Sequence, residues 1–235
     1  MSDRYESVAG DGDHFDAYCA VPASGTGPGI LLFQEIFGIN DNMRGLADKL
    51  AAEGYVALVP DMFWRLERRF ERKDESGFDD ALAMVGRLDF GKVPVDIQAT
   101  HAHLLGLPEC NGKVGAVGFC LGGTLTFLAA ATSQVDGKGI DAAVSYYGSG
   151  NNDLLGMVPQ VACPTMFIYG NTDAFIPEDK IVEVEDAIAG HPHLSLHRYD
   201  AGHAFSNWDA PSMYDAAAAE AAWTRTLAFF REHLG

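Results

Sequence analysis

Short apolar runs alternate with amphipathic segments along most of the chain. The apolar runs predict strands, and the segments between them, with apolar residues at helical spacing, predict helices. Near-continuous apolar strands separated by helices are typical of a mostly parallel sheet covered on both faces. The expected strands are 14–21, 29–34, 55–59, 114–119, 142–147, 165–169 and 194–199. The expected helices lie within 41–53, 78–105, 124–132, 177–189 and 211–232, and Pro177 and Pro211 are expected in the first turn of the last two.

Length and charge limit the classes of protein to which the chain can belong. Its 235 residues suit one α/β domain spanning 1–235, since such folds commonly reach this length as a single unit. A formal net charge of −17 makes binding to nucleic acid or to an anionic membrane unfavourable, because both would repel the protein. The polar N-terminal residues and the lack of a long apolar run predict a cytoplasmic protein. The expected partner is a small molecule, and a monomer is one possibility that the sequence leaves open.

Four cysteines are spread along the chain, at positions 19, 110, 120 and 163. None belongs to a C-x-x-C pair, so the sequence suggests neither a zinc site nor a disulfide framework, and all four are expected to be reduced thiols. Cys19 and Cys163 read as packing residues of strands, and Cys110 reads as a loop residue. No metal or organic cofactor is implied.

One strand-to-helix junction has the sequence expected of a nucleophile elbow. Gly118-Phe-Cys-Leu-Gly122 is G-x-S-x-G with sulfur in place of oxygen, and it joins an apolar strand to a helix of small and apolar residues. The glycines matter because such a turn is strained, and a Cβ at either position would clash with the crossing backbone. The turn would expose the thiol of Cys120 at the end of the strand and aim the amide of Leu121 at a substrate oxygen.

Two other interpretations of this junction are possible. A glycine-rich strand-to-helix turn also begins a dinucleotide-binding fold, but glycines at 115, 118, 122 and 123 do not contain G-x-G-x-x-G, and no Walker lysine follows. The second interpretation is that Cys120 is a small buried hydrophobe, as most free cysteines are. The motif alone leaves that second interpretation open.

Two residues after later strands could complete a catalytic triad with Cys120. Asp173 follows the strand 165–169, and His203 lies in a glycine-flanked loop just past the last strand. Functional residues gather at the carboxyl ends of strands in an open parallel sheet, and nucleophile, acid, base is the chain order of α/β-hydrolases. Asp173 could instead cap a turn or a helix, and most histidines do no chemistry. The conjunction of all three predicts a triad in which His203 takes or shares the thiol proton.

The loop after the second apolar strand supplies candidates for the rest of the site. Ile36 is the expected second amide of an oxyanion hole, together with Leu121. Glu35 is unusual there, because a negative charge works against a developing oxyanion. It is either a surface residue, ion-paired for example with Arg44, or a switchable base that hydrogen-bonds the resting thiol of Cys120 and takes its proton when substrate arrives.

The segment 63–77 departs from the regular alternation, because basic residues are interleaved there with acids. The basic residues are Arg65, Arg68, Arg69, Arg72 and Lys73. The favoured interpretation is a solvated surface held by ion pairs. The alternative is a mobile cap that recruits an anionic substrate.

Four motifs together resemble the dienelactone hydrolase family, over nearly the whole chain. They are Gln34-Glu-Ile-Phe-Gly-Ile-Asn40, Asn111-Gly-Lys-Val-Gly-Ala-Val-Gly-Phe-Cys-Leu-Gly-Gly123, Tyr146-Tyr-Gly148 and Gly202-His-Ala-Phe205. The resemblance implies an α/β-hydrolase fold with a triad at Cys120, His203 and Asp173. It also implies that Glu35 contacts the resting cysteine and helps to make the thiolate. The family's best-known activity is hydrolysis of the enol-lactone ring of dienelactone in bacterial degradation of chlorinated aromatics.

The likeness weakens where enzymes of this family hold the ring carboxylate with two arginines. Phe78 and Asn207 stand at those positions, and neither pairs with a carboxylate. The expected activity is therefore thiol-dependent hydrolysis of small lactones or activated esters, with a thioester on Cys120 as intermediate. The expected substrate-binding residues are Phe37, Trp64, Phe78, Tyr146, Phe205 and Asn207, although each aromatic residue could equally belong to the core.

Two other functions stay open. One is a general esterase or peptidase that acts on unactivated substrates. The other is a redox or binding module that uses Cys120 as a sensor thiol without turnover.

Overall fold

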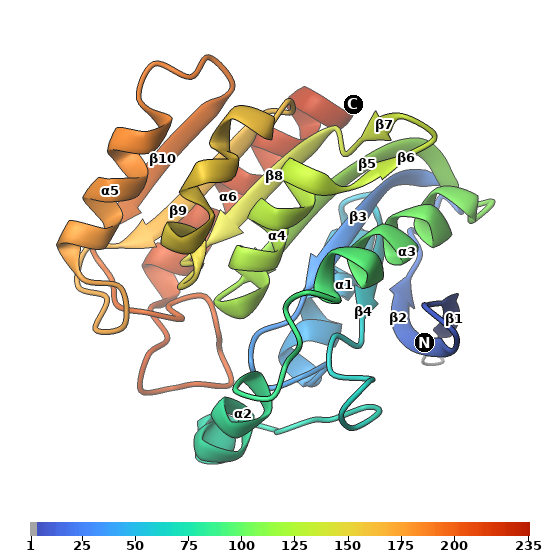
Figure 1. Cartoon of the computed structure of the whole chain (residues 1–235), viewed down its shortest axis with the longest axis horizontal. Helices are drawn as coiled ribbons and strands as arrows, with labels where there is room; N and C mark the ends of the chain where they lie inside the picture. Colours follow the sequence, from blue (N-terminus) through green and yellow to red (C-terminus); the bar gives the residue numbers. More distant parts are fainter. Residues whose placement is uncertain (1–3) are drawn as a thin grey trace.

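An eight-stranded sheet forms the centre of the molecule in the computed structural model, which describes residues 4–235 (Figure 1). Its strands are β1 (Tyr5–Ala9), β2 (His14–Ala20), β3 (Gly27–Phe33), β4 (Val56–Pro60), β5 (Cys110–Phe119), β8 (Ala142–Tyr146), β9 (Thr165–Gly170) and β10 (Leu194–Tyr199). Their order in space is β1-β2-β4-β3-β5-β8-β9-β10. The β1/β2 and β2/β4 pairs are antiparallel and the other pairs are parallel, which confirms the expected mostly parallel sheet.

Helices cover both faces of this sheet. Figure 1 shows α4 and α5 in front of the sheet and α6 behind it. The helices are α1 (Asp41–Ala52), α2 (Phe78–Val85), α3 (Val93–Gly106), α4 (Leu121–Thr132), α5 (Glu178–Ile188) and α6 (Ala216–Leu234). Two 3-10 segments, η1 (Glu75–Gly77) and η2 (Asn151–Gln160), and a small hairpin of β6 (Gln134–Val135) and β7 (Lys138–Gly139) lie between them.

The middle strands are buried from end to end because helices shield them on both sides. Every residue of β3, β4, β8 and β9 is buried, whereas the edge strand β10 is half-buried along its whole length. This burial explains why the strands read as near-continuous apolar runs. The loops that follow the parallel strands β3, β5, β9 and β10 emerge at one edge of the sheet, where functional residues of such folds gather.

The last helix begins later than its sequence pattern predicts. It starts at Ala216 rather than at Pro211, because Asp215 caps it with a carboxylate oxygen that accepts the N–H of Ala218 at 2.9 Å. Pro211 therefore lies in the turns that precede the helix, and the expectation for its position is wrong. Pro177 also lies just outside its helix, as the N-cap residue of α5.

The other differences lie at strand and helix ends. β1 pairs antiparallel with β2 and is a strand that the apolar pattern did not predict, because four of its five residues are exposed or half-buried. Cys110 begins β5 and is not a loop residue. Cys19 and Cys163 are buried, as expected of packing residues. Among residues 4–235, no helix has the length and apolarity needed to cross a bilayer.

Candidate active site

Cys120 lies at a strained turn between the buried strand β5 and the helix α4. Its φ of 54° and ψ of −116° lie in a region that non-glycine residues rarely adopt. A Cβ on Gly118 would lie 2.1 Å from the carbonyl oxygen of Gly122, and a Cβ on Gly122 would lie 2.2 Å from that of Phe33. Glycine is therefore required on both sides of the turn, which has the geometry of a nucleophile elbow. The thiol is partly exposed and is not enclosed in the core.

His203 and Asp173 meet at the same edge of the sheet, on the loops that follow β10 and β9. The Nδ1 atom of His203 lies 2.7 Å from Oδ2 of Asp173, and both side chains are almost fully buried. The other carboxylate oxygen, Oδ1, accepts the backbone N–H groups of Phe175 and Ile176 at 2.8 and 2.9 Å. Asp173 thus makes the turn-capping bonds considered for it and also orients the imidazole of His203.

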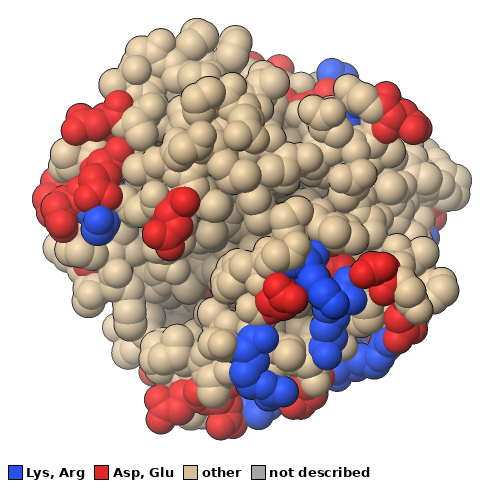
Figure 2. Space-filling model, viewed as in Figure 1, with Lys and Arg blue, Asp and Glu red and all other residues tan. Residues whose placement is uncertain are grey.

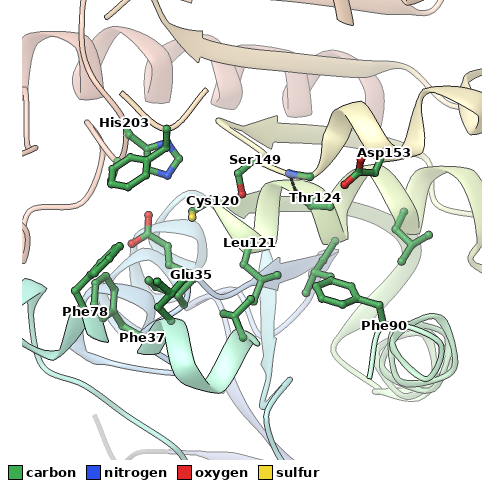
Figure 3. Close-up of a pocket in the computed structure, with 18 of the residues that line it drawn as sticks. Glu35, Phe37, Phe78, Phe90, Cys120, Leu121, Thr124, Ser149, Asp153 and His203 are labelled. Atoms are coloured by element: carbon green, nitrogen blue, oxygen red, sulfur yellow. Dashed lines mark hydrogen bonds between the residues drawn. The ribbon is translucent and has the colours of Figure 1, made fainter. Parts of the chain in front are cut away.

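The charge of His203 depends on the groups around its ring. Burial disfavours the imidazolium, but the neighbouring thiolate of Cys120 and carboxylate of Asp173 outweigh this cost and raise the pKa of His203 to about 10. The ring also packs against Tyr147 and Phe175, with centroid distances of 5.0 and 5.1 Å. Figure 3 shows Cys120, His203 and Glu35 lying together in the site. An imidazolium fixed there places a positive charge beside Cys120.

Glu35 is a buried carboxylate and does not form the surface ion pair considered for it. It is 4% exposed, and Arg44 pairs with Asp41 and Glu71 instead, at 2.6 and 2.9 Å. Burial raises the pKa of Glu35 to about 7, although the positive charge of His203 and two hydrogen bonds oppose that rise. This carboxylate therefore changes its charge near neutral pH.

The hydrogen bonds of Glu35 differ from what the resemblance implied. The hydroxyl of Tyr147 donates to one carboxylate oxygen at 3.4 Å, and the amide of Asn207 donates to the other. Within residues 4–235, no hydrogen bond joins Glu35 to Cys120. A neutral amide at position 207 stabilises the carboxylate less than an arginine would, which leaves the effect of burial on the pKa dominant.

The two backbone amides expected to form an oxyanion hole belong to different segments of the chain. Ile36 follows Glu35 on the loop after β3, and Leu121 is the first residue of α4. Both residues line the same cavity as Cys120. Neither backbone N–H has a hydrogen-bond acceptor within residues 4–235, so both are available to a substrate oxygen.

These groups open onto a cavity of about 520 Å³ whose walls are mostly apolar. Phe37 and Phe78 line it, as expected of substrate-binding residues. The acidic residues in its wall are Glu35 and Asp153, and none of the lysines and arginines among residues 4–235 lines it. The cavity thus has no lysine or arginine to hold a substrate carboxylate, and the imidazolium of His203, which also lines it, is already paired with Asp173.

Two of the aromatic residues expected to bind substrate lie in the core instead. Trp64 stacks on Phe15 with a centroid distance of 5.3 Å, and its indole N–H donates to Asp96 at 3.0 Å. Phe205 is fully buried. Neither residue lines the cavity.

Tyr146 and Asn207 also lie outside the cavity wall. The hydroxyl of Tyr146 lies 2.7 Å from that of Thr226, behind the sheet, whereas the next residue, Tyr147, reaches Glu35. Consecutive residues at a strand end point to opposite sides, so only one of the two tyrosines reaches the site. Asn207 acts on the site through Glu35.

The sequence analysis did not single out much of the cavity wall. Phe78, Leu82 and Val85 recur at i, i+4 and i+7 on α2, and that spacing gives one apolar face that could have been recognised. Residues from five other segments approach the site only in the folded chain. They are Phe90, Thr124, Ser149, Asp153, Phe175 and Met213.

The arginines of the segment 63–77 are each paired with an acid. The pairs are Arg65 with Asp96 at 2.8 Å, Arg68 with Asp13 at 2.6 Å, Arg69 with Asp16 at 2.6 Å and Arg72 with Asp80 at 3.0 Å. Figure 2 shows basic side chains interspersed with acidic ones on this face of the molecule. The interpretation as a surface held by ion pairs is confirmed, and none of these arginines lines the cavity.

Known proteins resemble this chain over almost its full length. The model of the dienelactone hydrolase family matches residues 15–234. A carboxymethylenebutenolidase from a Pseudomonas species is 35% identical over 218 residues, which cover 92% of this chain and 89% of that protein. Carboxymethylenebutenolidase 1 from Cupriavidus pinatubonensis is 33% identical over 229 residues, which cover 97% and 95%.

Solved structures agree with these sequence relatives. A Klebsiella pneumoniae protein assigned as a dienelactone hydrolase superposes with a TM-score of 0.84 at 28% identity, over 98% of each chain. A Pyrococcus furiosus esterase superposes with a TM-score of 0.71 at 15% identity, over 100% of this chain and 93% of that one, which shows the shared fold. The chain therefore belongs to the dienelactone hydrolase family and is a lactone or ester hydrolase with the α/β-hydrolase fold.

Proposed function

We propose that this protein hydrolyses small lactones or activated esters through a triad of Cys120, His203 and Asp173, and that its substrates are uncharged. The observation that carries the proposal is the 2.7 Å contact between His203 and Asp173 beside a cavity that also holds Cys120 on its strained turn. A buried acid, an oriented imidazole and a partly exposed sulfur form the constellation that nucleophilic acyl transfer needs.

The reaction follows from the charges of these groups. The Cys120 thiolate attacks the carbonyl carbon, and the amides of Ile36 and Leu121 hold the resulting oxyanion. The C–O bond then breaks, and the departing oxygen takes the proton of the His203 imidazolium. The imidazole, now neutral and held by Asp173, removes a proton from water, which attacks the thioester and releases the Cys120 thiolate.

The preference for uncharged substrates follows from the cavity wall. Glu35 and Asp153 are acidic members of that wall, and the wall has no lysine or arginine among the residues described. Phe78 and Asn207 occupy the positions where the family's arginines bind the ring carboxylate. A carboxylate in this cavity would lose its hydration without gaining an ion pair to a lysine or arginine, and the imidazolium of His203 is already paired with Asp173, so its burial is costly.

Replacement of the triad residues tests the proposal. Cys120→Ala and His203→Ala should each lower kcat/KM for p-nitrophenyl acetate by at least about 1000-fold, as in other triad enzymes. Cys110→Ala is the matched control, because it removes a thiol from the start of β5, outside the cavity, and should leave the rate unchanged. A Cys120→Ala variant that retains turnover would refute the thiol mechanism. A parent protein whose thiol oxidises but which turns over no ester would be a sensor.

The charge preference is tested by comparing lactones. Neutral lactones assayed beside cis-dienelactone should give the higher kcat/KM, because only the latter brings a carboxylate into a cavity whose wall has no lysine or arginine among the residues described. Equal or faster turnover of cis-dienelactone would show that the missing arginines do not matter.

A further inference from the structure

The cavity is larger than a small lactone needs, and Cys120 lies between its two ends. A volume of about 520 Å³ is typical of sites that enclose drug-sized ligands. In Figure 3, His203 and Phe78 lie on one side of Cys120, and Phe90 lies on the other. A substrate whose carbonyl carbon meets the sulfur therefore extends in two directions.

The position of His203 decides which half of an ester lies on which side. The departing oxygen receives its proton from the imidazolium of His203, so the alcohol half must lie on that side. The carbonyl oxygen points to the amides of Ile36 and Leu121. The remaining substituent of the carbonyl carbon, the acyl chain, must then lie on the side of Phe90.

That side of the cavity is an apolar groove, here named the acyl arm. Its walls come from α2, the segment after it and the first turn of α3 on one side and from α4 on the other. They consist of Leu82, Val85, Phe90, Pro94, Leu125 and Leu128. On α4, the residues Leu121, Leu125 and Leu128 recur at i, i+4 and i+7, so the groove follows the helix for about 10 Å from the elbow.

The outer part of the acyl arm is open to water. Leu82 and Phe90 are 53% and 48% exposed, which is unusual for side chains of their size and apolarity. Asp153 lies at the same end of the cavity and is exposed (Figure 3). An acyl chain that covers the leucine and phenylalanine would remove this apolar surface from water, whereas an anionic chain would meet the carboxylate of Asp153.

We propose that the acyl arm binds a saturated, uncharged acyl chain of medium length, so that the preferred substrates are esters of medium-chain fatty acids. The inference rests on the proposed function, since it assumes that the acyl carbon bonds to Cys120. In that step the alcohol leaves with the proton of His203. Water then releases the fatty acid and restores the thiolate.

A chain-length series tests the inference. The p-nitrophenyl esters of acetate, butyrate, hexanoate and octanoate share one leaving group, so differences in kcat/KM report the acyl arm. Each buried methylene should raise kcat/KM by up to about fourfold, and octanoate should exceed acetate by at least about tenfold. An optimum at acetate would overturn the inference.

Substitutions that fill the acyl arm test whether the chain-length preference arises there. Val85→Trp from α2 and Leu128→Trp from α4 place a large ring in the arm from opposite walls, and both should abolish the preference for octanoate over acetate. Val95→Trp is the matched control, because Val95 is 50% exposed on α3 and does not line the cavity. That variant should keep the parent's octanoate-to-acetate ratio. A ratio that survives both groove-filling variants would overturn the inference.

The same assays separate this inference from the proposed function. Loss of acetate hydrolysis in Cys120→Ala, together with a flat chain-length series in the parent, would leave the triad intact and refute only the acyl arm. Acetate hydrolysis that persists in Cys120→Ala would refute the thiol mechanism, whatever the chain-length series shows.

Discussion

At the scale of single residues, the proposed triad predicts that His203 raises the reactivity of the thiol. Its pKa of about 10 keeps the imidazolium protonated through neutral pH, which puts a positive charge beside Cys120. We therefore expect His203→Ala to slow the alkylation of Cys120 by iodoacetamide at pH 7 by about tenfold or more, because a neighbouring imidazolium favours the thiolate, which is the attacking species.

Mass spectrometry of the peptide that contains Cys120 gives the alkylation rate. The peptide that contains Cys110 is the internal control, because Cys110 lies outside the cavity and its rate should be the same in both proteins. Equal rates for Cys120 in parent and variant would show that His203 does not activate the thiol.

Glu35 couples the site to the stability of the fold. Its pKa in the folded protein, about 7, lies above its ordinary value of 4.5, so the folded state binds the proton more tightly than the unfolded state. The stability that this carboxyl group contributes is complete below about pH 4.5 and is lost as the pH rises through about 7. When the pH rises from about 5 to about 8, the parent should lose this contribution and Glu35→Gln should not. The free energy of unfolding of the variant should therefore increase relative to that of the parent over this range, by at most on the order of 3 kcal/mol.

Urea denaturation of both proteins at the two pH values measures this gain in the free energy of unfolding. The prediction fails if the difference between variant and parent is the same at both pH values.

At the scale of elements, the elbow depends on how closely α4 approaches β3. A Cβ at position 122 would lie 2.2 Å from the carbonyl oxygen of Phe33, so Gly122→Ala must push the helix away from the strand. We expect a loss of at least about 2 kcal/mol in the free energy of unfolding. The displaced Cys120 should lower kcat/KM for p-nitrophenyl acetate by about 100-fold or more.

Gly106→Ala is the control for this substitution. Gly106 is the last residue of α3, and a Cβ there would meet nothing within 4 Å. Alanine at that position should stabilise the protein by up to about 1 kcal/mol and leave the rate unchanged. Urea denaturation and ester hydrolysis measured on both variants test this prediction. A stable, active Gly122→Ala would show that the elbow tolerates a side chain.

At the scale of the whole molecule, we propose that residues 1–235 form one domain. The last helix, α6, returns to the first half of the chain, where Phe230 packs against Tyr55 with a centroid distance of 6.0 Å and Arg231 pairs with Glu53 at 2.6 Å. Contacts of this kind make the two halves unfold together. Urea unfolding followed by circular dichroism and by tryptophan fluorescence should therefore give coincident curves, and two separate transitions would contradict a single domain.

The sequence predicted most elements because their burial is simple. A strand such as β3, shielded on both sides, must be apolar throughout, and its pattern shows this directly. The ends of the elements were harder to predict, because a single capping residue can decide where a helix begins, as Asp215 does for α6. The triad candidates could be predicted because each directly follows a strand, and the loops that follow parallel strands lie at one edge of the sheet.

The amino-acid sequence by itself determined the α/β architecture, the elbow around Cys120 and the family, because these depend on local patterns of apolar residues and glycines. Tertiary structure alone decided which side chains face the cavity. Trp64 and Phe205 went into the core, Tyr147 rather than Tyr146 reached Glu35, and α2 supplied a wall. The reason is physical: an aromatic residue gains a similar free energy from burial in either place, so only the packing of distant segments settles its direction.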